Sequence, residues 1–340
     1  MPWRALDVRP LHLRRQPGRP QLKRDPLGSF STSRRGTVLT RSLPPGLLLI
    51  LGACGSAAKP ATHEFNATRA FQYLEAQVRF GPRIPNTTSH DSCGEWILAH
   101  LQATADTVIV QAFTARTKRG QYLRLRNFLA RFKPRASERV LYLAHWDTRP
   151  HADKSPNPSD RNEPILGAND GASGVAILLT LADVLKTTPP RVGVDLLFTD
   201  GEDYGDFSDT TATLLGARHF AAHLPSGYPP LYAVLWDMVG DKNLLISFEG
   251  NSQAFAPEVV DLVWHVADSL GYSRIFVRQL GQPLIDDHVR LQAAGIHAID
   301  VVDFEYGPDN SYHHTVFDTP DKVSAQSLQV VGDVALALVR

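Results

Sequence analysis

Beyond residue 64, the apolar residues follow two alternating patterns. Some stretches repeat them at the spacing of an amphipathic helix, and these are 67–79, 89–104, 170–188, 213–224, 253–270 and 322–340. Others are short continuous apolar runs bounded by turn residues, and these are 106–116, 124–132, 139–147, 191–200, 232–240, 243–250 and 296–304. Apolar runs that alternate with helices predict an α/β fold, with a mostly parallel sheet covered by helices on both faces.

The first 54 residues have a different composition. Residues 1–35 are rich in Arg and Pro and show no apolar period, and a basic segment then leads into a short apolar run that ends in Leu51-Gly52-Ala53-Cys54. This pattern predicts a basic N-terminus and lipoprotein-type signal over 1–54, followed by a tether over 55–64. The apolar run is too short to span a bilayer, which needs about 20 apolar residues.

A lipoprotein signal would send the protein out of the cytoplasm to the bacterial cell envelope. A lipid on Cys54 would then be its only attachment to the membrane, and the protein would face the periplasm. Two alternatives remain open. Translation could start at Val38 or Leu39 through a non-AUG codon, or the segment could be the basic N-terminus of a cytosolic protein.

The charged residues are unevenly distributed along the chain. The whole sequence has 35 basic and 35 acidic residues, but ten of the basic and only two of the acidic ones precede Cys54. The remainder therefore carries 25 basic and 33 acidic residues. Because this part is acidic, a nucleic-acid partner is not expected.

Polar residues collect where the predicted strands end. His145 and Asp147 follow one apolar run, Asp200-Gly201-Glu202-Asp203 follows the next, and Asp237 and Asp303 follow two later ones. In a parallel sheet, ligands bind beyond the carboxyl ends of the strands. The loop positions Asp170 and His314 are expected at the same rim of the sheet.

Each of these residues has an ordinary explanation when it is taken alone. Asp170 could cap the helix that follows it, the acidic turn could be solvated, and His313-His314 could be an exposed pair. Together they offer at least three His, Asp or Glu ligands, which is what a catalytic zinc ion requires, whereas a closed structural zinc site normally uses cysteines. The set predicts a hydrolytic or acyl-transfer zinc site.

The site residues lie in a series of longer motifs, which in chain order include "LAHWDTRP", "GANDGASGVAILL", "FTDGEDYGD", "LWDMVG", "IDDHVRLQAAGIHAIDVVDF" and "YHHTVFDTPDKVS". Taken in this order, the motifs resemble the zinc aminopeptidase family of cocatalytic exopeptidases, and they are most similar to its bacterial glutaminyl-peptide cyclotransferase (glutaminyl cyclase) branch. The resemblance covers about residues 65–340. It implies that 65–340 is one catalytic domain with three layers and a mixed twisted sheet.

The resemblance also implies roles for single residues. Asp170, Asp203 and His314 would bind the zinc that both branches share, and Glu202 would be the general base and acid. In the two-metal aminopeptidases, the residues that match His145 and Asp237 hold a second zinc, with Asp170 as the bridge.

In the cyclotransferases only one metal is used. The residue matching Asp237 then forms a hydrogen-bonded network with that matching Asp287, beside the substrate. His145 is therefore expected to be either a ligand of a second zinc or a residue that contacts the ligands of the first zinc without binding the metal. Asp147 is expected to orient His145 by accepting its other ring proton.

Both branches act on the N-termini of peptides or proteins. The reaction expected first is cyclisation of N-terminal glutamine to pyroglutamate with release of ammonia, because Asp286-Asp287-His288 resembles the cyclotransferase branch. Removal of N-terminal residues by an aminopeptidase is the alternative, and a silent, lipid-anchored binding protein is a remote one. His313 stands where the cyclotransferases have a tryptophan that walls the glutamine pocket.

Overall fold

The structure is a computed structural model that describes residues 64–205 and 212–340. The predicted signal over 1–54, Cys54 included, lies outside the described residues, as does the tether apart from Glu64. Within the described part of the chain, no helix has the length and apolar character needed to cross a membrane.

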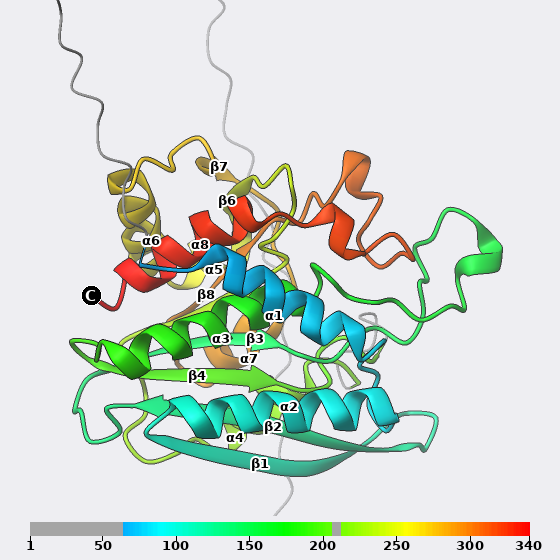
Figure 1. Cartoon of the computed structure of the whole chain (residues 1–340), viewed down its shortest axis with the longest axis horizontal. Helices are drawn as coiled ribbons and strands as arrows, with labels where there is room; N and C mark the ends of the chain where they lie inside the picture. The colour runs from blue at the N-terminus through cyan, green and yellow to red at the C-terminus, as the bar shows by residue number, and fades with distance from the viewer. Residues whose placement is uncertain (1–63, 206–211) are drawn as a thin grey trace, which may run out of the picture. The chain divides into compact units, whose positions relative to one another are not determined.

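A six-stranded mixed sheet forms the centre of the fold, in the order β1-β2-β4-β3-β5-β8 (Figure 1). Its strands are β1 (Thr107–Arg116), β2 (Tyr122–Phe132), β3 (Arg139–His145), β4 (Gly193–Thr199), β5 (Ala233–Asp237) and β8 (Ala298–Val302). Strands β3, β4, β5 and β8 run parallel, while β1 and β2 are antiparallel to their neighbours. The short connection between β1 and β2 can join only antiparallel strands, whereas α3 provides the crossover from β3 to β4.

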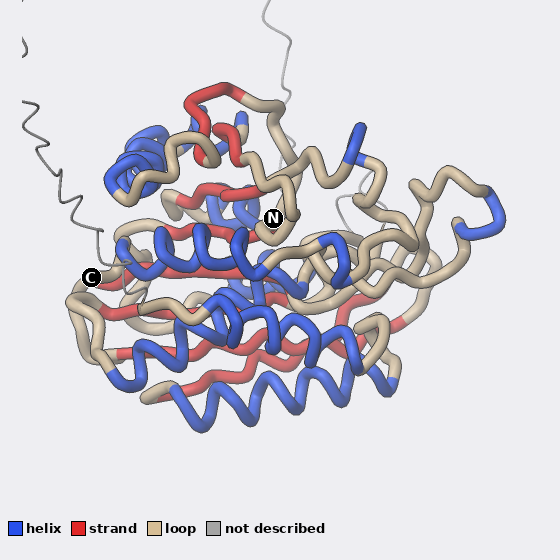
Figure 2. The backbone as a smooth tube through the Cα atoms, turned by 45° about the horizontal axis from the view of Figure 1, so that its top comes forward, coloured by secondary structure: helices blue, strands red, loops and turns tan. Residues whose placement is uncertain are grey.

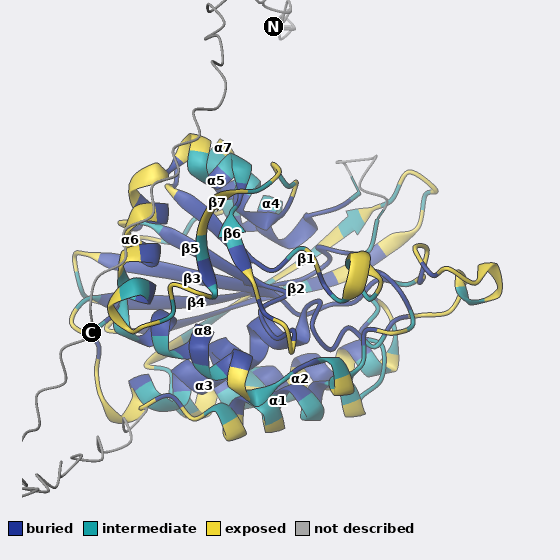
Figure 3. Ribbon diagram, turned by 90° about the horizontal axis from the view of Figure 1, so that it is seen from above, coloured by how far each residue is buried: buried dark blue, intermediate teal, exposed yellow. Residues whose placement is uncertain are grey.

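Helices cover both faces of this sheet (Figure 3). One face carries α1 (Ala67–Arg79), α2 (Thr88–Thr104), α3 (Ala172–Thr187) and α8 (Ala325–Ala337), and the other carries α4 (Leu215–Ala222) and α7 (Asp287–Ala293). Alternate residues of β3 enter separate hydrophobic cores: Tyr142 packs in the first, and Leu141 joins Phe220 and Leu291 in the second. The predicted three-layer α/β architecture is confirmed.

A smaller unit lies beside the β8 edge (Figure 2). It contains β6 (Ile246–Phe248) and β7 (Phe276–Leu280), which pair in parallel, together with α5 (Gly250–Phe255) and α6 (Pro257–Ser269). The sequence predicts one helix over 253–270, but two are present. Pro257 has no N–H to continue the ladder and disfavours the helical conformation at the residue before it, so a new helix begins there.

Two glycines bring α3 close to the sheet and thereby set the position of Asp170. A Cβ on Gly174 would lie 2.0 Å from the carbonyl oxygen of Trp236 in β5. Gly171 has a φ of +93°, and a Cβ there would lie 2.9 Å from the carbonyl oxygen of Asp147. The start of α3 can therefore approach the carboxyl ends of both β3 and β5.

Candidate active site

A cavity of about 480 Å³ opens at the carboxyl ends of the parallel strands. Asp170, Glu202, Asp237, Asp286 and His314 contribute polar groups to its lining, so residues from distant parts of the sequence meet at the rim where they are expected. Loop residues Leu284 and Ile285, together with Phe304, provide an apolar side.

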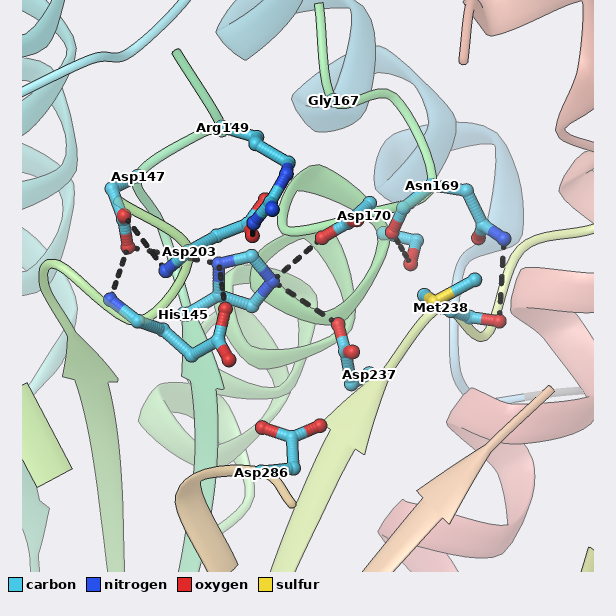
Figure 4. Close-up of polar contacts among 12 residues, drawn as sticks. His145, Asp147, Arg149, Gly167, Asn169, Asp170, Asp203, Asp237, Met238 and Asp286 are labelled. Atoms are coloured by element: carbon cyan, nitrogen blue, oxygen red, sulfur yellow. Dashed lines mark hydrogen bonds and ion pairs between the residues drawn. The ribbon is translucent and has the colours of Figure 1, made fainter. Parts of the chain in front are cut away.

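His145 ends β3 and lies between two carboxylates (Figure 4). Its Nε2 atom is 3.1 Å from an oxygen of Asp170 and 3.2 Å from an oxygen of Asp237. Burial alone would lower the pKa of His145, but the carboxylates of Asp147, Asp170 and Asp237 outweigh burial and raise this pKa well above its usual value. Ligand atoms of His145, Asp170 and Asp237 lie within 4.8 Å of one another, so this trio has the spacing of a metal site.

Asp147 fixes the turn that follows β4. Its carboxylate oxygens accept hydrogen bonds from the backbone N–H groups of Glu202, at 3.0 Å, and Asp203, at 3.2 Å. The expected hydrogen bond from His145 is not formed, because Nδ1 of His145 lies 3.6 Å from the nearer Asp147 oxygen. Asp147 is satisfied by the two backbone donors instead, and it positions Glu202 and Asp203 rather than the imidazole.

Asp170 does not cap α3. Gly171 occupies the N-cap position, and the Asp170 side chain turns toward two imidazoles, with one oxygen 3.1 Å from Nε2 of His145 and the other 3.5 Å from Nε2 of His314. The backbone N–H of Asp170 donates to a carboxylate oxygen of Asp318 at 3.2 Å. The capping explanation of Asp170 therefore does not hold.

Asp203 and His314 complete the group that the sequence predicts as zinc ligands. Nε2 of His314 lies 3.5 Å from an oxygen of Asp203, the same distance that separates it from Asp170. His314 has a φ of +57°, a conformation that non-glycine residues adopt rarely and that often marks a functional position. The Oδ2 atom of Asp203 is buried and accepts no hydrogen bond from the described residues.

Arg149 is a site residue that the sequence analysis did not identify. Its Nη1 atom donates to Oδ1 of Asp203 at 2.7 Å, and its Nε and Nη2 atoms donate to the two oxygens of Asp153. The segment "DTRPHAD" could have drawn attention to Arg149, because it places Arg149 and Asp153 four residues apart directly after the predicted strand, as a possible ion pair.

Asp286, rather than Asp287, lines the pocket with Glu202. Asp287 is fully buried and accepts a hydrogen bond from the Thr199 hydroxyl at 2.5 Å. Burial and then the charge of Asp286 raise the pKa of Glu202 well above its usual value. Burial and then the charge of Asp237 raise the pKa of Asp286 to about 7.

The donor set suits a divalent metal ion. Four buried carboxylates, those of Asp170, Glu202, Asp203 and Asp237, gather around two imidazoles, although each buried negative charge raises the free energy of the others. A bound cation would compensate this charge, and the buried, unpartnered oxygen of Asp203 is available to it. His and carboxylate ligands with an open side are typical of catalytic zinc sites.

Comparison with known proteins assigns this chain to a family. Residues 127–339 match Peptidase family M28. Aminopeptidase YwaD of Bacillus subtilis is 27% identical over 247 residues, which cover 68% of this chain and 46% of that protein. The chain spans about half the length of the curated relatives it matches.

Two solved structures are similar over most of the described residues. The Bacteroides thetaiotaomicron glutaminyl cyclase bound to N-acetylhistamine is 36% identical, with a TM-score of 0.77, covering 81% of this chain and 97% of that one. A Zn-dependent exopeptidase from Parabacteroides distasonis is 34% identical, with a TM-score of 0.78, covering 81% and 98%. This chain belongs to Peptidase family M28, a family of zinc-dependent enzymes.

Proposed function

We propose that this protein is a glutaminyl-peptide cyclotransferase, which converts N-terminal glutamine to pyroglutamate and releases ammonia. The observation that carries the proposal is the pair of buried carboxyl groups, Glu202 and Asp286, in the pocket beside the predicted ligands. Cyclisation requires a group that takes a proton from one substrate nitrogen and returns it to another. Burial and the charge of a neighbouring carboxylate raise the pKa of each group, through Asp286 for Glu202 and through Asp237 for Asp286, so these carboxyls are suited to taking up and returning a proton.

Asp170, Asp203 and His314 would hold one zinc ion, and zinc bound there would act as a Lewis acid toward the side-chain carbonyl of the glutamine. In this assignment His145 is not a metal ligand. Its Nε2 atom lies 3.1 Å from an oxygen of Asp170 and 3.2 Å from an oxygen of Asp237, so the imidazole separates these two carboxylates. One zinc is sufficient because the nucleophile belongs to the substrate.

The remaining steps use the protein's own groups. Glu202 takes a proton from the α-amine of the substrate, and the amine nitrogen forms a bond to the side-chain carbonyl carbon of the glutamine. The bond from this carbon to the side-chain nitrogen then breaks, and Glu202 returns the proton to the departing nitrogen, which leaves as ammonia. Asp286 and Asp237 line the same cavity and would orient the α-amine. A tethered nucleophile needs little beyond this orientation and proton transfer.

A zinc aminopeptidase is the second candidate, and one observation favours it. His145, Asp170 and Asp237 have the spacing of a metal site of their own, so a second zinc could be bound with Asp170 as the bridge. Glu202 would then take a proton from a water molecule that attacks the first peptide bond. The similarity to aminopeptidase YwaD is consistent with this candidate.

Two peptides distinguish the candidates. The zinc-loaded full-length protein is incubated with one peptide that begins with Gln and one that begins with Leu, and the products are identified by mass spectrometry. The proposal expects the Gln peptide to lose ammonia while the Leu peptide stays intact. Release of free Leu would instead assign the aminopeptidase reaction.

We also propose that the protein is exported and attached to the bacterial envelope through a lipid on Cys54. The support is the short apolar run that ends in Leu51-Gly52-Ala53-Cys54. Metabolic labelling of the native host with a fatty acid should label the protein. Replacing Cys54 by Ser should abolish this label, and an unlabelled wild-type protein would contradict the anchor.

A further inference from the structure

We propose that Lys154 selects peptides that carry a carboxylate on the residue after the N-terminal one. This inference rests on the proposed action on peptide N-termini and concerns which of them bind well. Lys154 lines the same pocket as the catalytic residues, yet it is exposed to solvent, so it lies at the rim.

No ion pair with the described residues compensates the charge of Lys154. Arg149, the other cation of the lining, contacts Asp153 at 2.8 Å and Asp203 at 2.7 Å. Nζ of Lys154 has no carboxylate within 4.0 Å among residues 64–205 and 212–340. Its hydrogen-bond partner is a nitrogen, Nδ1 of His313 at 3.3 Å. An acidic group of a substrate would therefore give this ammonium a favourable partner.

His313 and His314 fix where Lys154 stands relative to the reacting atoms. The backbone N–H of Lys154 donates to the carbonyl of His314 at 3.2 Å, and the rings of His313 and His314 are 3.9 Å apart between centroids. The amide of Asn310 also lies 3.3 Å from Nδ1 of His313, which helps to hold this ring. One ring, that of His313, thus separates Nζ of Lys154 from the predicted zinc ligand His314, and adjacent residues of a peptide are spaced about 3.8 Å apart. The residue after the N-terminal one is within its reach.

The rest of the pocket makes this contact selective. The interior carries Asp170, Glu202, Asp237 and Asp286, so an acidic side chain is repelled there and is favoured only at the rim. The side formed by Leu284, Ile285 and Phe304 is apolar and offers no second cation. A basic second residue would be repelled by Lys154. The expected order of preference at this position is acidic, then neutral, then basic.

The test compares Gln-Glu-Ala-amide with its neutral isostere Gln-Gln-Ala-amide on the zinc-loaded full-length protein. The acidic peptide should have a kcat/KM about two to five times higher, the effect of an exposed ion pair, and the gain should lie mainly in KM. The preference should shrink as ionic strength rises.

Variants then assign the preference to one residue. Lys154→Met should bring the ratio of the two kcat/KM values close to one, Lys154→Glu should invert it, and Lys154→Arg should keep it. Lys242→Met removes an exposed lysine outside the pocket lining and should leave the ratio unchanged. An unaltered ratio in Lys154→Met would overturn the proposal.

The carboxylate could come from an acidic side chain or from the C-terminus of a dipeptide. Comparing Gln-Ala with Gln-Ala-amide separates these sources, because only the first carries a C-terminal carboxylate. A preference that depends on Lys154 in either pair supports the proposal and identifies the source, whereas independence from Lys154 in both pairs would refute it.

Binding separates this inference from the proposed reaction. Calorimetry with pyroglutamyl-Glu-Ala-amide and pyroglutamyl-Gln-Ala-amide measures the preference without turnover. If no Gln peptide is cyclised, the proposed function fails, and hydrolysis of Leu-Glu-Ala-amide against Leu-Gln-Ala-amide tests Lys154 alone. A wild-type protein without preference in both kinetics and binding contradicts the role of Lys154.

Discussion

Nη1 of Arg149 lies 2.7 Å from Oδ1 of Asp203, the aspartate that the sequence predicts as a zinc ligand. The guanidinium is itself held by Asp153, so one oxygen of Asp203 is fixed, and the other is buried and has no hydrogen-bond partner among the described residues. We infer that Arg149 fixes the direction in which the side chain of Asp203 presents its second oxygen.

Replacing Arg149 by Gln should therefore weaken zinc binding by about ten- to one-hundred-fold, the usual effect of losing a group that orients a ligand. Competition with a chromophoric chelator measures this affinity. Arg149→Lys keeps the charge but loses the planar guanidinium, so its zinc affinity should lie between those of the wild-type protein and Arg149→Gln. Tighter zinc binding in Arg149→Gln would show that the guanidinium competes with the metal.

The positions of Asp286 and Asp287 predict two different phenotypes. Asp286→Asn should lower kcat by about one hundred-fold or more while zinc stays bound, because a carboxyl of the pocket is lost. Asp287→Ala should mainly lower the melting temperature, since it leaves the buried Thr199 hydroxyl without its acceptor. Steady-state kinetics, metal analysis and thermal unfolding of both variants give the comparison. A greater loss of kcat in Asp287→Ala would return the catalytic role to Asp287.

Glu202→Gln should suppress turnover with zinc retained. The amide keeps the shape of the side chain and the backbone contact with Asp147, but it cannot accept the proton. We expect kcat to fall by about 10²- to 10⁴-fold at an unchanged zinc content, measured by elemental analysis. Loss of zinc in this variant would mean that Glu202 supports the metal site instead.

Glu249 gives a prediction about stability that is independent of the metal. Burial would raise its pKa, but the imidazole of His288, whose Nε2 atom is 3.1 Å from a Glu249 oxygen, and hydrogen bonds from Ser252 and the backbone of Leu284 prevail and lower it to about 2 from the ordinary 4.5. A lowered pKa in the folded state means that the carboxylate stabilises the protein above pH 4.5 and loses this effect as the pH falls to about 2. Its carboxylate also holds Leu284 in the apolar side of the pocket.

The wild-type protein and Glu249→Gln should accordingly differ most in the free energy of unfolding near pH 6, and the difference should narrow as the pH falls through 4.5. Urea unfolding at several pH values measures it. Glu258→Gln is the control, because Glu258 is an exposed carboxylate whose ion pair with His297 lies on the surface, and it should change the stability little at any of these pH values. If the free energies of unfolding of the wild-type protein and Glu249→Gln differed by the same amount at every pH, the lowered pKa of Glu249 would be contradicted.

Much of the fold could be predicted because its signals are local. The helix expected over 67–79 matches α1, and the apolar run at 139–147 contains β3, since period and turn residues mark such elements directly. Helix α7 and strand β7 were not predicted. Strand β7 is largely exposed and α7 has only seven residues, so neither shows a strong pattern of apolar positions.

The site also has features that the sequence predicts and features that it does not. The polar residues at strand ends meet because parallel strands end at one edge of the sheet, which sequence order alone indicates. The choice between Asp286 and Asp287 depends on a single backbone position: Asp286 is the N-cap of α7 and extended, while Asp287 is already helical. The contact between Arg149 and Asp203 joins two loops, so no local pattern predicts it.

Cyclisation is tested most directly with a peptide whose N-terminal glutamine carries nitrogen-15 in the side-chain amide. The zinc-loaded protein is mixed with this peptide, and both products are followed by mass spectrometry, with Glu202→Gln as the inactive control. The proposal predicts labelled ammonia and a peptide that keeps every residue. Release of labelled free glutamine, with a peptide shortened by one residue, would contradict it and establish an aminopeptidase.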